Sequence, residues 1–152
     1  MKIGIISDTH DHLTKIKEAM DIFLLHKVEL ILHAGDFVAP FSLRFLNDSG
    51  IEWWGVFGNN DGEREGLLKF SSGRIKEPPF FITLKEKRVA LMHEFEPVEA
   101  DIIIFGHTHN PQIEEKENTL VINPGEACGW LSGNSSLIIF DFSTFKPQVI
   151  YF

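Results

Sequence analysis

Two pairs of metal-capable side chains stand where apolar runs of the sequence end. Asp8 and His10 follow the first apolar run, and His107 and His109 follow the run Asp101–Phe105. Side chains alternate along extended backbone, so an Asp-x-His or His-x-His pair aims two ligands the same way. The ends of strands are also where open α/β sheets present their sites. The spacing therefore predicts a metal centre at the end of a sheet.

Three further polar side chains occupy equivalent positions, each after an apolar run: Asp36, Asn59 and His93. Burying two carboxylates and several imidazoles at one edge of a core is costly unless a cation pairs with them. With Asp36 shared, the first ion takes Asp8, His10 and His109, and the second takes Asn59, His93 and His107. Two ions about 3.5–4 Å apart clamp a phosphoryl group and turn a bridging water into a hydroxide nucleophile, which predicts hydrolysis of a phosphate ester.

The predicted ligand set contains no thiolate, and this favours an open catalytic site over a closed structural zinc site. Imidazole, carboxylate and amide ligands suit Mn²⁺, Ni²⁺, Fe²⁺ and Zn²⁺, so the residues leave the metal open among these four. Two carboxylates against two divalent ions leave the site positive. A phosphate anion is therefore attracted to it although the net charge of the chain is −8.

The apolar periodicity predicts strand–helix units in the first half of the chain and mainly strands in the second. Helices are expected at Leu13–Phe23, Pro40–Leu46 and Asp61–Phe70. Strands are expected at Lys2–Ser7, Val28–Leu32, Glu52–Phe57, Phe80–Leu84, Arg88–Met92, Asp101–Phe105, Gln112–Lys116, Leu120–Ile122, Ser136–Phe142 and Pro147–Tyr151. With no linker between the halves, this pattern predicts an α/β fold: a four-layer α-β-β-α sandwich of two mixed sheets.

Length, charge and cysteine content narrow the class of protein. The 152 residues fit a single domain, 1–152, with enough apolar content for one core. The net charge of −8 disfavours nucleic acid and anionic membranes as partners. The single cysteine, Cys128, cannot form an internal disulfide, and the chain begins directly with a predicted strand, so we expect a cytoplasmic protein. No apolar run reaches the roughly 20 residues of a transmembrane helix.

The ordered motifs resemble those of the calcineurin-like metallophosphoesterases. They are Asp8-Thr9-His10, Gly35-Asp36, Gly58-Asn59-Asn60-Asp61, the lone His93 and Gly106-His107-Thr108-His109. Within that superfamily, Ser7–His12, Gly58–Arg64 and Ile122–Glu126 are similar to the small archaeal and bacterial phosphodiesterase branch. The resemblance covers nearly the whole chain. It implies a two-layer β core with flanking helices, two divalent metals on the seven residues above, and hydrolysis of phosphodiesters, typically with manganese or nickel.

One departure from the superfamily pattern concerns the leaving group. Many members have a histidine after the Gly-Asn asparagine that can protonate the leaving group, whereas this chain has Asn60, whose amide gives no proton in this pH range. We therefore expect activated aryl phosphodiesters to be cleaved far faster than alkyl ones. The predicted catalytic residues are Asp36, Asn60 and His107. A phosphate contact and a turn role compete evenly for Asn60, and Asp61 is predicted to orient a metal-bound imidazole.

A second departure is the short connection Glu94–Ala100 between His93 and the next strand. A parallel crossover normally needs about 10–12 residues, so we expect no helix there and an open rim to the cleft.

Three functions compete. The preferred function is a metal-dependent phosphodiesterase acting on a small phosphodiester. A phosphomonoesterase would need additional cations to bind the extra charge of its substrate, and none is clearly placed for that. A non-catalytic scaffold, such as the vesicle-coat subunit of this fold, would have lost part of the ligand set.

The aromatic side chains of one cluster either pair two subunits into a homodimer or pack in the core; they are Trp53, Trp54, Phe80 and Phe81. Of the remaining polar residues, His33 is predicted to be a core histidine and Arg64 a solvated helical arginine.

Overall fold

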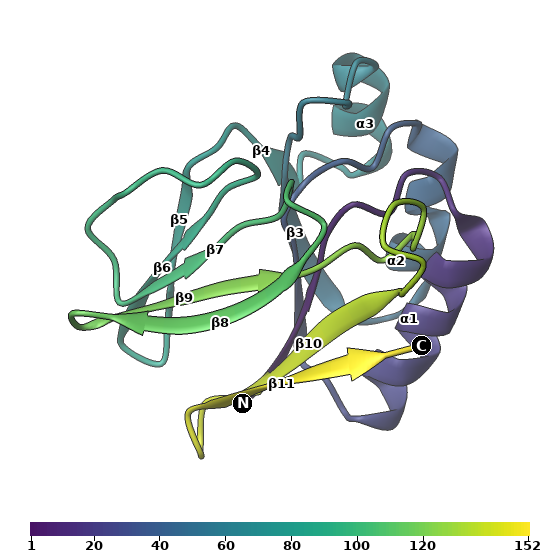
Figure 1. The fold of residues 1–152 in the computed structure, drawn as a ribbon. Helices are drawn as coiled ribbons and strands as arrows, with labels where there is room; N and C mark the ends of the chain where they lie inside the picture. Colours follow the sequence, from purple (N-terminus) through teal and green to yellow (C-terminus); the bar gives the residue numbers. More distant parts are fainter.

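The computed structural model describes all 152 residues as two β-sheets and three α-helices (Figure 1). The first sheet has the order β11-β10-β1-β2-β3-β4, and the second has the order β5-β6-β7-β9-β8. The first contains β1 (Lys2–Ile6), β2 (Leu30–His33), β3 (Glu52–Val56), β4 (Ile75–Lys76), β10 (Ser136–Asp141) and β11 (Lys146–Tyr151). The second contains β5 (Phe80–Leu84), β6 (Lys87–Leu91), β7 (Ile102–Ile104), β8 (Pro111–Lys116) and β9 (Thr119–Pro124). Both sheets mix parallel and antiparallel pairs.

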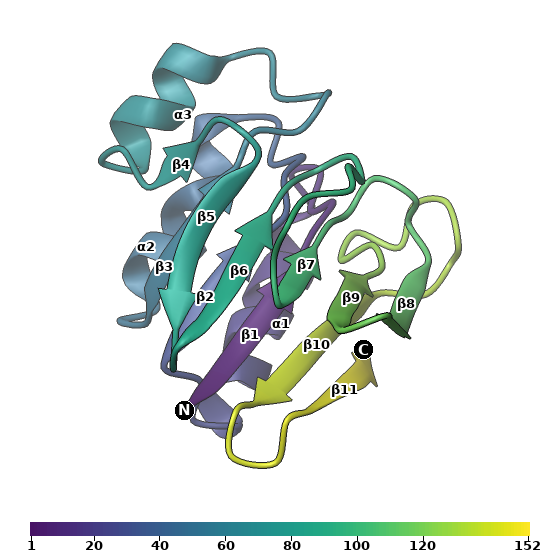
Figure 2. The same cartoon turned by 90° about the vertical axis from the view of Figure 1, so that its left-hand side faces the viewer.

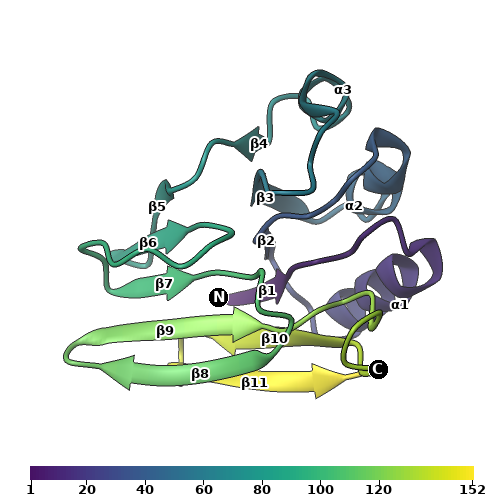
Figure 3. The same ribbon diagram turned by 45° about the horizontal axis from the view of Figure 1, so that its top comes forward.

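The helices cover one face of the first sheet (Figure 3). They are α1 (Leu13–Leu25), α2 (Arg44–Asp48) and α3 (Arg64–Phe70), with a 3₁₀ turn at Pro40–Leu43. Helix α1 buries Ile16, Ala19, Met20 and Phe23, which share one side of a helix of 3.6 residues per turn. The ring of Phe23 rests where a side chain on Gly4 would stand, so the glycine lets α1 pack closely on β1.

A second apolar layer lies between the two sheets. Ile3 and Ile5 of β1 face into it, whereas Ile6 belongs to the core under the helices. Leu91 of β6 and Ile104 of β7 meet these side chains from the second sheet. The strands in the middle of each sheet are therefore buried on both faces, which explains why their sequences read as unbroken apolar runs.

The α/β fold with two mixed sheets and flanking helices is confirmed, but helices flank only one of the two outer faces. The outer face of the second sheet carries Met92, Ile103 and Val121, and the connection after β6 packs Val98 against them. The fourth, helical layer of the predicted sandwich is thus replaced by a loop. The cause is the short connection to β7, which forms no helix, as its length predicted.

Local predictions agree with the structure to within a few residues, with two differences. The predicted helix at Pro40–Leu46 divides into the 3₁₀ turn and α2, and the two-residue strand β4 was not predicted. Trp53 is 1% exposed and belongs to the core, so it is not part of a surface through which two subunits could pair. The structure has no helix with the length and apolarity that crossing a membrane requires.

The topology brings several strand ends to one edge of the molecule. Strands β1, β2 and β3 run parallel in the first sheet, and β6, β7 and β9 run parallel in the second. The ends of β6 and β7 point to a common edge (Figure 2), and the loops that follow them meet the loops that follow β1 and β2.

Candidate metal centre

Asp8, His10 and His109 form one group of converging side chains. Nε2 of His109 lies 3.4 Å from Oδ1 of Asp8, and Nε2 of His10 lies 3.8 Å from the same oxygen. Both Asp8 Oδ1 and His10 Nε2 are buried without a hydrogen-bond partner. Orphaned polar atoms are costly to bury. Because an oxygen and two ring nitrogens point at a common space, a cation there would satisfy all three.

Asn59, His93 and His107 form a second group. Oδ1 of Asn59 lies 2.8 Å from Nε2 of His93 and 3.0 Å from Nδ1 of His107. These three atoms come from the loops after β3, β6 and β7, so they lie together only because the two sheets pack face to face. An amide oxygen with two imidazole nitrogens is again a donor set that divalent transition metals accept.

Asp36 lies between the two groups. Its Oδ2 is 3.4 Å from Nε2 of His10 in the first group and 3.5 Å from Nε2 of His93 in the second. The backbone N–H of Asn60 donates to Oδ1 at 2.9 Å, and the Asn60 side-chain amide donates to Oδ2 at 2.7 Å. The Asp36 carboxylate is therefore within reach of both groups and is fixed in place by Asn60.

Two of the imidazoles are oriented through their other ring nitrogen. Nδ1 of His93 donates to the carbonyl oxygen of Ala34 at 2.7 Å, and Nδ1 of His109 lies 2.8 Å from Oε2 of Glu126. Such contacts fix the ring so that Nε2 faces Asn59 in the case of His93 and Asp8 in the case of His109, where it could hold an ion. Burial disfavours the charge of Glu126, but hydrogen bonds from Ser132, His109 and Leu131 lower its pKa to about 2.

The pKa shifts of the buried groups in the two clusters point the same way. The carboxylate of Asp8, 3.8 Å from Nε2, raises the pKa of His10. Burial opposes the charge of His93, but the carboxylate of Asp36, 3.5 Å away, raises the pKa overall. Burial also opposes the charge of Asp36, yet the nearby ring of His93 and the hydrogen bonds from Asn60 hold its pKa well below the usual range. Two buried carboxylates thus favour positive charge beside them, and divalent ions can supply it.

The backbone is strained at most of these positions. Five of the seven candidate ligands have positive φ, namely Asp8 (52°), His10 (40°), Asp36 (60°), His107 (65°) and His109 (61°). Left-handed backbone costs about 1–3 kcal/mol at a residue other than glycine, although Asp, Asn and His tolerate it best.

Three glycines leave the room that this arrangement needs. A Cβ on Gly58 would collide with the carboxylate and backbone of Asp36, and a Cβ on Gly106 would collide with Ser7 and Asp8. A Cβ on Gly35 would stand 2.7 Å from Nδ1 of His93. The Gly-Asp, Gly-Asn and Gly-His pairs of the sequence therefore have a steric cause.

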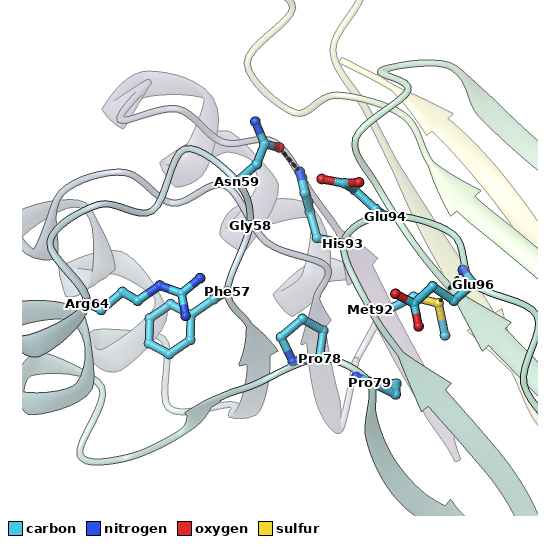
Figure 4. Close-up of a pocket in the computed structure, with 10 residues that line it drawn as sticks. All are labelled: Phe57, Gly58, Asn59, Arg64, Pro78, Pro79, Met92, His93, Glu94 and Glu96. Atoms are coloured by element: carbon cyan, nitrogen blue, oxygen red, sulfur yellow. Dashed lines mark hydrogen bonds between the residues drawn. The ribbon is translucent and has the colours of Figure 1, made fainter.

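A pocket of about 270 Å³ opens beside the second group (Figure 4). Asn59 and His93 line one end of it, while Glu94 and Glu96 come from the segment that follows β6. The guanidinium of Arg64 lies 4.6 Å above the ring of Phe57 and donates to the Glu77 carboxylate at 2.8 and 2.9 Å. The positive charge in this pocket is therefore already paired.

Comparison with known proteins decides the family. The model of the calcineurin-like phosphoesterase superfamily domain matches residues 1–144. The chain belongs to this superfamily. The phosphoesterase is 40% identical to a phosphodiesterase of Methanocaldococcus jannaschii over 93% of both chains. The solved structure of an archaeal phosphodiesterase superimposes with a TM-score of 0.91 at 34% identity, covering 100% of both chains. A structure of Vps29 from Entamoeba histolytica superimposes with a TM-score of 0.74 at 18% identity. The superposition covers 100% of this chain and 99% of the Vps29 chain, so the two proteins share the fold.

The phosphoesterase brings all seven predicted ligands together in two groups around Asp36. Asn60 lies there too, but its side-chain amide bonds to Asp36, a contact that the sequence did not predict. The prediction for Asp61 is wrong: its carboxylate accepts from the backbone N–H groups of Asp36, Val38 and Gly58, not from an imidazole. Asp61 therefore ties the loop after β2 to the loop after β3, as a short carboxylate in a turn commonly does.

Sequence reasoning missed the role of Glu126. The motif Ile122–Glu126 contributes to the family resemblance, but nothing local distinguishes this glutamate from a surface one. Its 0% exposure is the signal, and burial appears only in the structure. His33 is a core histidine as predicted: burial lowers its pKa to about 3, and its ring nitrogens meet Gly35 N–H and the Thr9 hydroxyl.

Proposed function

We propose that this phosphoesterase is a phosphodiesterase that hydrolyses a small phosphodiester with two divalent ions at the site described above. The observation that carries the proposal is the position of Asp36, which reaches His10 on one side and His93 on the other through the same oxygen. A lone structural ion would not need a carboxylate shared in this way.

The residues fit two ions. Asp8, His10, His109 and Asp36 would hold the first, and Asp36, Asn59, His93 and His107 the second. We propose manganese or nickel, and the same ligands suit iron or zinc. When bound, such ions act as Lewis acids on the phosphoryl oxygens and lower the pKa of the water that attacks phosphorus.

The chain's own residues do the positioning. Asn60 holds both carboxylate oxygens of Asp36, and its amide retains a second N–H that can donate to a phosphate oxygen. His107 lies on the exposed rim, where it can contact a bound phosphate. Glu126 and the carbonyl of Ala34 keep the rings of His109 and His93 oriented toward the centre.

A phosphodiester fits the surroundings better than a phosphomonoester. A monoester brings a second negative charge, and a free cation near the site would favour it. Arg64 is the cation of the adjoining pocket, and Glu77 already neutralises it. Glu94 and Glu96 add negative charge to the same pocket. The relatives named above as phosphodiesterases support this choice.

The test is hydrolysis by the metal-free protein after separate addition of Mn²⁺, Ni²⁺, Fe²⁺ and Zn²⁺. We expect release of p-nitrophenol from bis(p-nitrophenyl) phosphate, with at least one metal, to exceed release from p-nitrophenyl phosphate. The substitution Asp36→Asn should lower the rate of diester hydrolysis by at least about 100-fold, because we propose that one oxygen of Asp36 binds both ions. Asp21→Asn, on the exposed face of α1, is the matched control and should leave the rate unchanged.

Two results would overturn the proposal. A faster reaction with the monoester would assign the chain as a phosphomonoesterase. A folded, metal-loaded protein that turns over neither ester would favour the scaffold function instead.

A further inference from the structure

Trp130 is an exposed tryptophan beside the metal centre. It is 63% exposed, and its neighbour Leu131 is 76% exposed. The indole N–H groups of the other two tryptophans are hydrogen-bonded to side chains: Trp53 donates to Asn47, and Trp54 donates to Glu52. Tryptophan carries a large apolar ring with one polar N–H, and such side chains are enriched at binding interfaces.

The indole is not a loose side chain. It stacks on the ring of His12, with the centroids 4.6 Å apart and the planes 24° from parallel. The loop between β9 and β10 lies against the start of α1 in two views (Figures 1 and 3). Because consecutive Cα atoms are 3.8 Å apart, those of His10 and His12 are at most about 7.6 Å apart. The histidine on which the indole stacks therefore stands only two residues from one of the first group of ligands.

A second path ties Trp130 to the same group. The backbone N–H of Leu131 donates to Oε1 of Glu126 at 3.0 Å, while Oε2 of that carboxylate lies 2.8 Å from Nδ1 of His109. The N–H of Cys128 donates to the carbonyl oxygen of Asp8 at 3.1 Å. The loop that carries Trp130 is thus fastened on both sides to residues of the metal centre, so the ring keeps a fixed position relative to it.

We propose that Trp130 stacks the nucleobase of the substrate, and that the substrate is a nucleoside phosphodiester. The inference rests on the proposed phosphodiesterase function and narrows its substrate class. One indole face is covered by His12, and the rest of the ring is open to receive a planar group. A base is planar and attached through its sugar to the phosphate that the ions would hold. The net charge of −8 favours a small nucleotide ester over a nucleic acid polymer.

The size of the expected effect follows from base stacking on aromatic side chains. Removing such a platform costs about 1–3 kcal/mol per base, which corresponds to about 5- to 150-fold in affinity. A methyl or glyceryl ester makes no such contact and would lose nothing. The prediction is therefore a selective effect on substrates that carry a base.

The test compares two esters that release the same p-nitrophenol: the p-nitrophenyl ester of thymidine monophosphate, and methyl p-nitrophenyl phosphate. With the Mn²⁺-loaded protein, Trp130→Ala should lower kcat/KM for the thymidine ester by about 5- to 150-fold and change that for the methyl ester by less than about twofold. Trp130→Phe should retain most of the preference. Tyr151→Ala, at an exposed aromatic on β11, is the matched control and should change neither. Equal losses for the two esters, or no loss, would overturn the proposal.

A binding measurement keeps this proposal separate from the catalytic one. Thymidine monophosphate should quench the tryptophan fluorescence of the Mn²⁺-loaded wild type and not that of Trp130→Phe, while ribose phosphate should quench neither. Absence of quenching in the wild type overturns the stacking proposal even where the methyl ester is hydrolysed. Quenching without hydrolysis of either ester would support the stacking site and count against the phosphodiesterase.

Discussion

The buried carboxylate of Glu126 lies 2.8 Å from Nδ1 of His109, and this contact turns Nε2 of the same ring toward Asp8. The carboxylate is held in turn by the backbone N–H groups of Leu131 and Ser132. Glu126, which is 17 positions from His109 in the sequence, thus orients one of the predicted ligands. Partners of this kind also make a metal-bound imidazole more basic.

Replacing Glu126 with Gln tests this relationship. The neutral amide keeps the shape but weakens the hold on His109, so the affinity for Mn²⁺ should fall by about 10- to 100-fold. Isothermal titration with Mn²⁺ measures it, and Glu114→Gln on the exposed strand β8 serves as the control. An unchanged affinity in Glu126→Gln, with the fold intact by circular dichroism, would show that the contact is dispensable.

The glycine next to Asn59 should not tolerate a methyl group. In Gly58→Ala the new Cβ would overlap the carboxylate of Asp36, so either Asp36 or the loop must move. We expect loss of Mn²⁺ binding and about 1–3 kcal/mol of destabilisation from overpacking. Gly62→Ala is the matched control, because nothing lies within 4 Å of its Cβ position. Comparable metal binding in the two variants would contradict the steric argument.

The single thiol should be inert in the folded protein. Burial raises the pKa of Cys128 to about 12, and the side chain is 3% exposed. At pH 8 the reactive thiolate is therefore scarce and shielded. Labelling with an aromatic disulfide reagent should be slow in buffer and complete within minutes in guanidinium chloride. Fast labelling of the native protein would show that the loop after β9 opens readily.

Divalent ions should stabilise the fold. A ligand that binds only the folded state at 100 times its Kd adds about 2.7 kcal/mol, which in a chain of this size raises Tm by roughly 5–10 °C. Asp8→Asn removes one of the two buried carboxylates of the centre, so most of this metal-dependent rise should disappear. Differential scanning calorimetry with and without Mn²⁺ measures both shifts. An equal rise in the two proteins would exclude Asp8 as a ligand.

Asn60 should make the enzyme dependent on a good leaving group. Its amide cannot donate a proton to an alkoxide, so bis(p-nitrophenyl) phosphate should be cleaved far faster than a dialkyl phosphate. The substitution Asn60→His introduces a group that can protonate the leaving oxygen, and it should raise the rate for the alkyl ester relative to the aryl ester. If the wild-type enzyme cleaves the two esters at equal rates while the chemical step limits turnover, the predicted dependence on a good leaving group is refuted.

Much of the site is readable from the sequence because each candidate ligand directly follows an apolar run. Asp8, Asp36 and His93 stand at strand ends, and parallel strands of a sheet end at the same edge. The order and type of the seven residues therefore predicted their convergence without any coordinates. The same local reasoning predicted that the connection after β6 is too short for a helix.

Other features depend on contacts between distant residues. Glu126 is 17 positions from His109, and the carboxylate of Asp61 meets the N–H of Asp36 25 positions earlier. The sequence shows neither pairing, because both depend on how loops fold over the strand ends after the sheets have packed. The same holds for the stacking of Trp130 on His12. The sequence by itself determined which groups could bind metal and at which strand ends they stand, because periodicity is a short-range property. Only the tertiary structure decided which partners hold those groups, because burial and contact are properties of the packed chain.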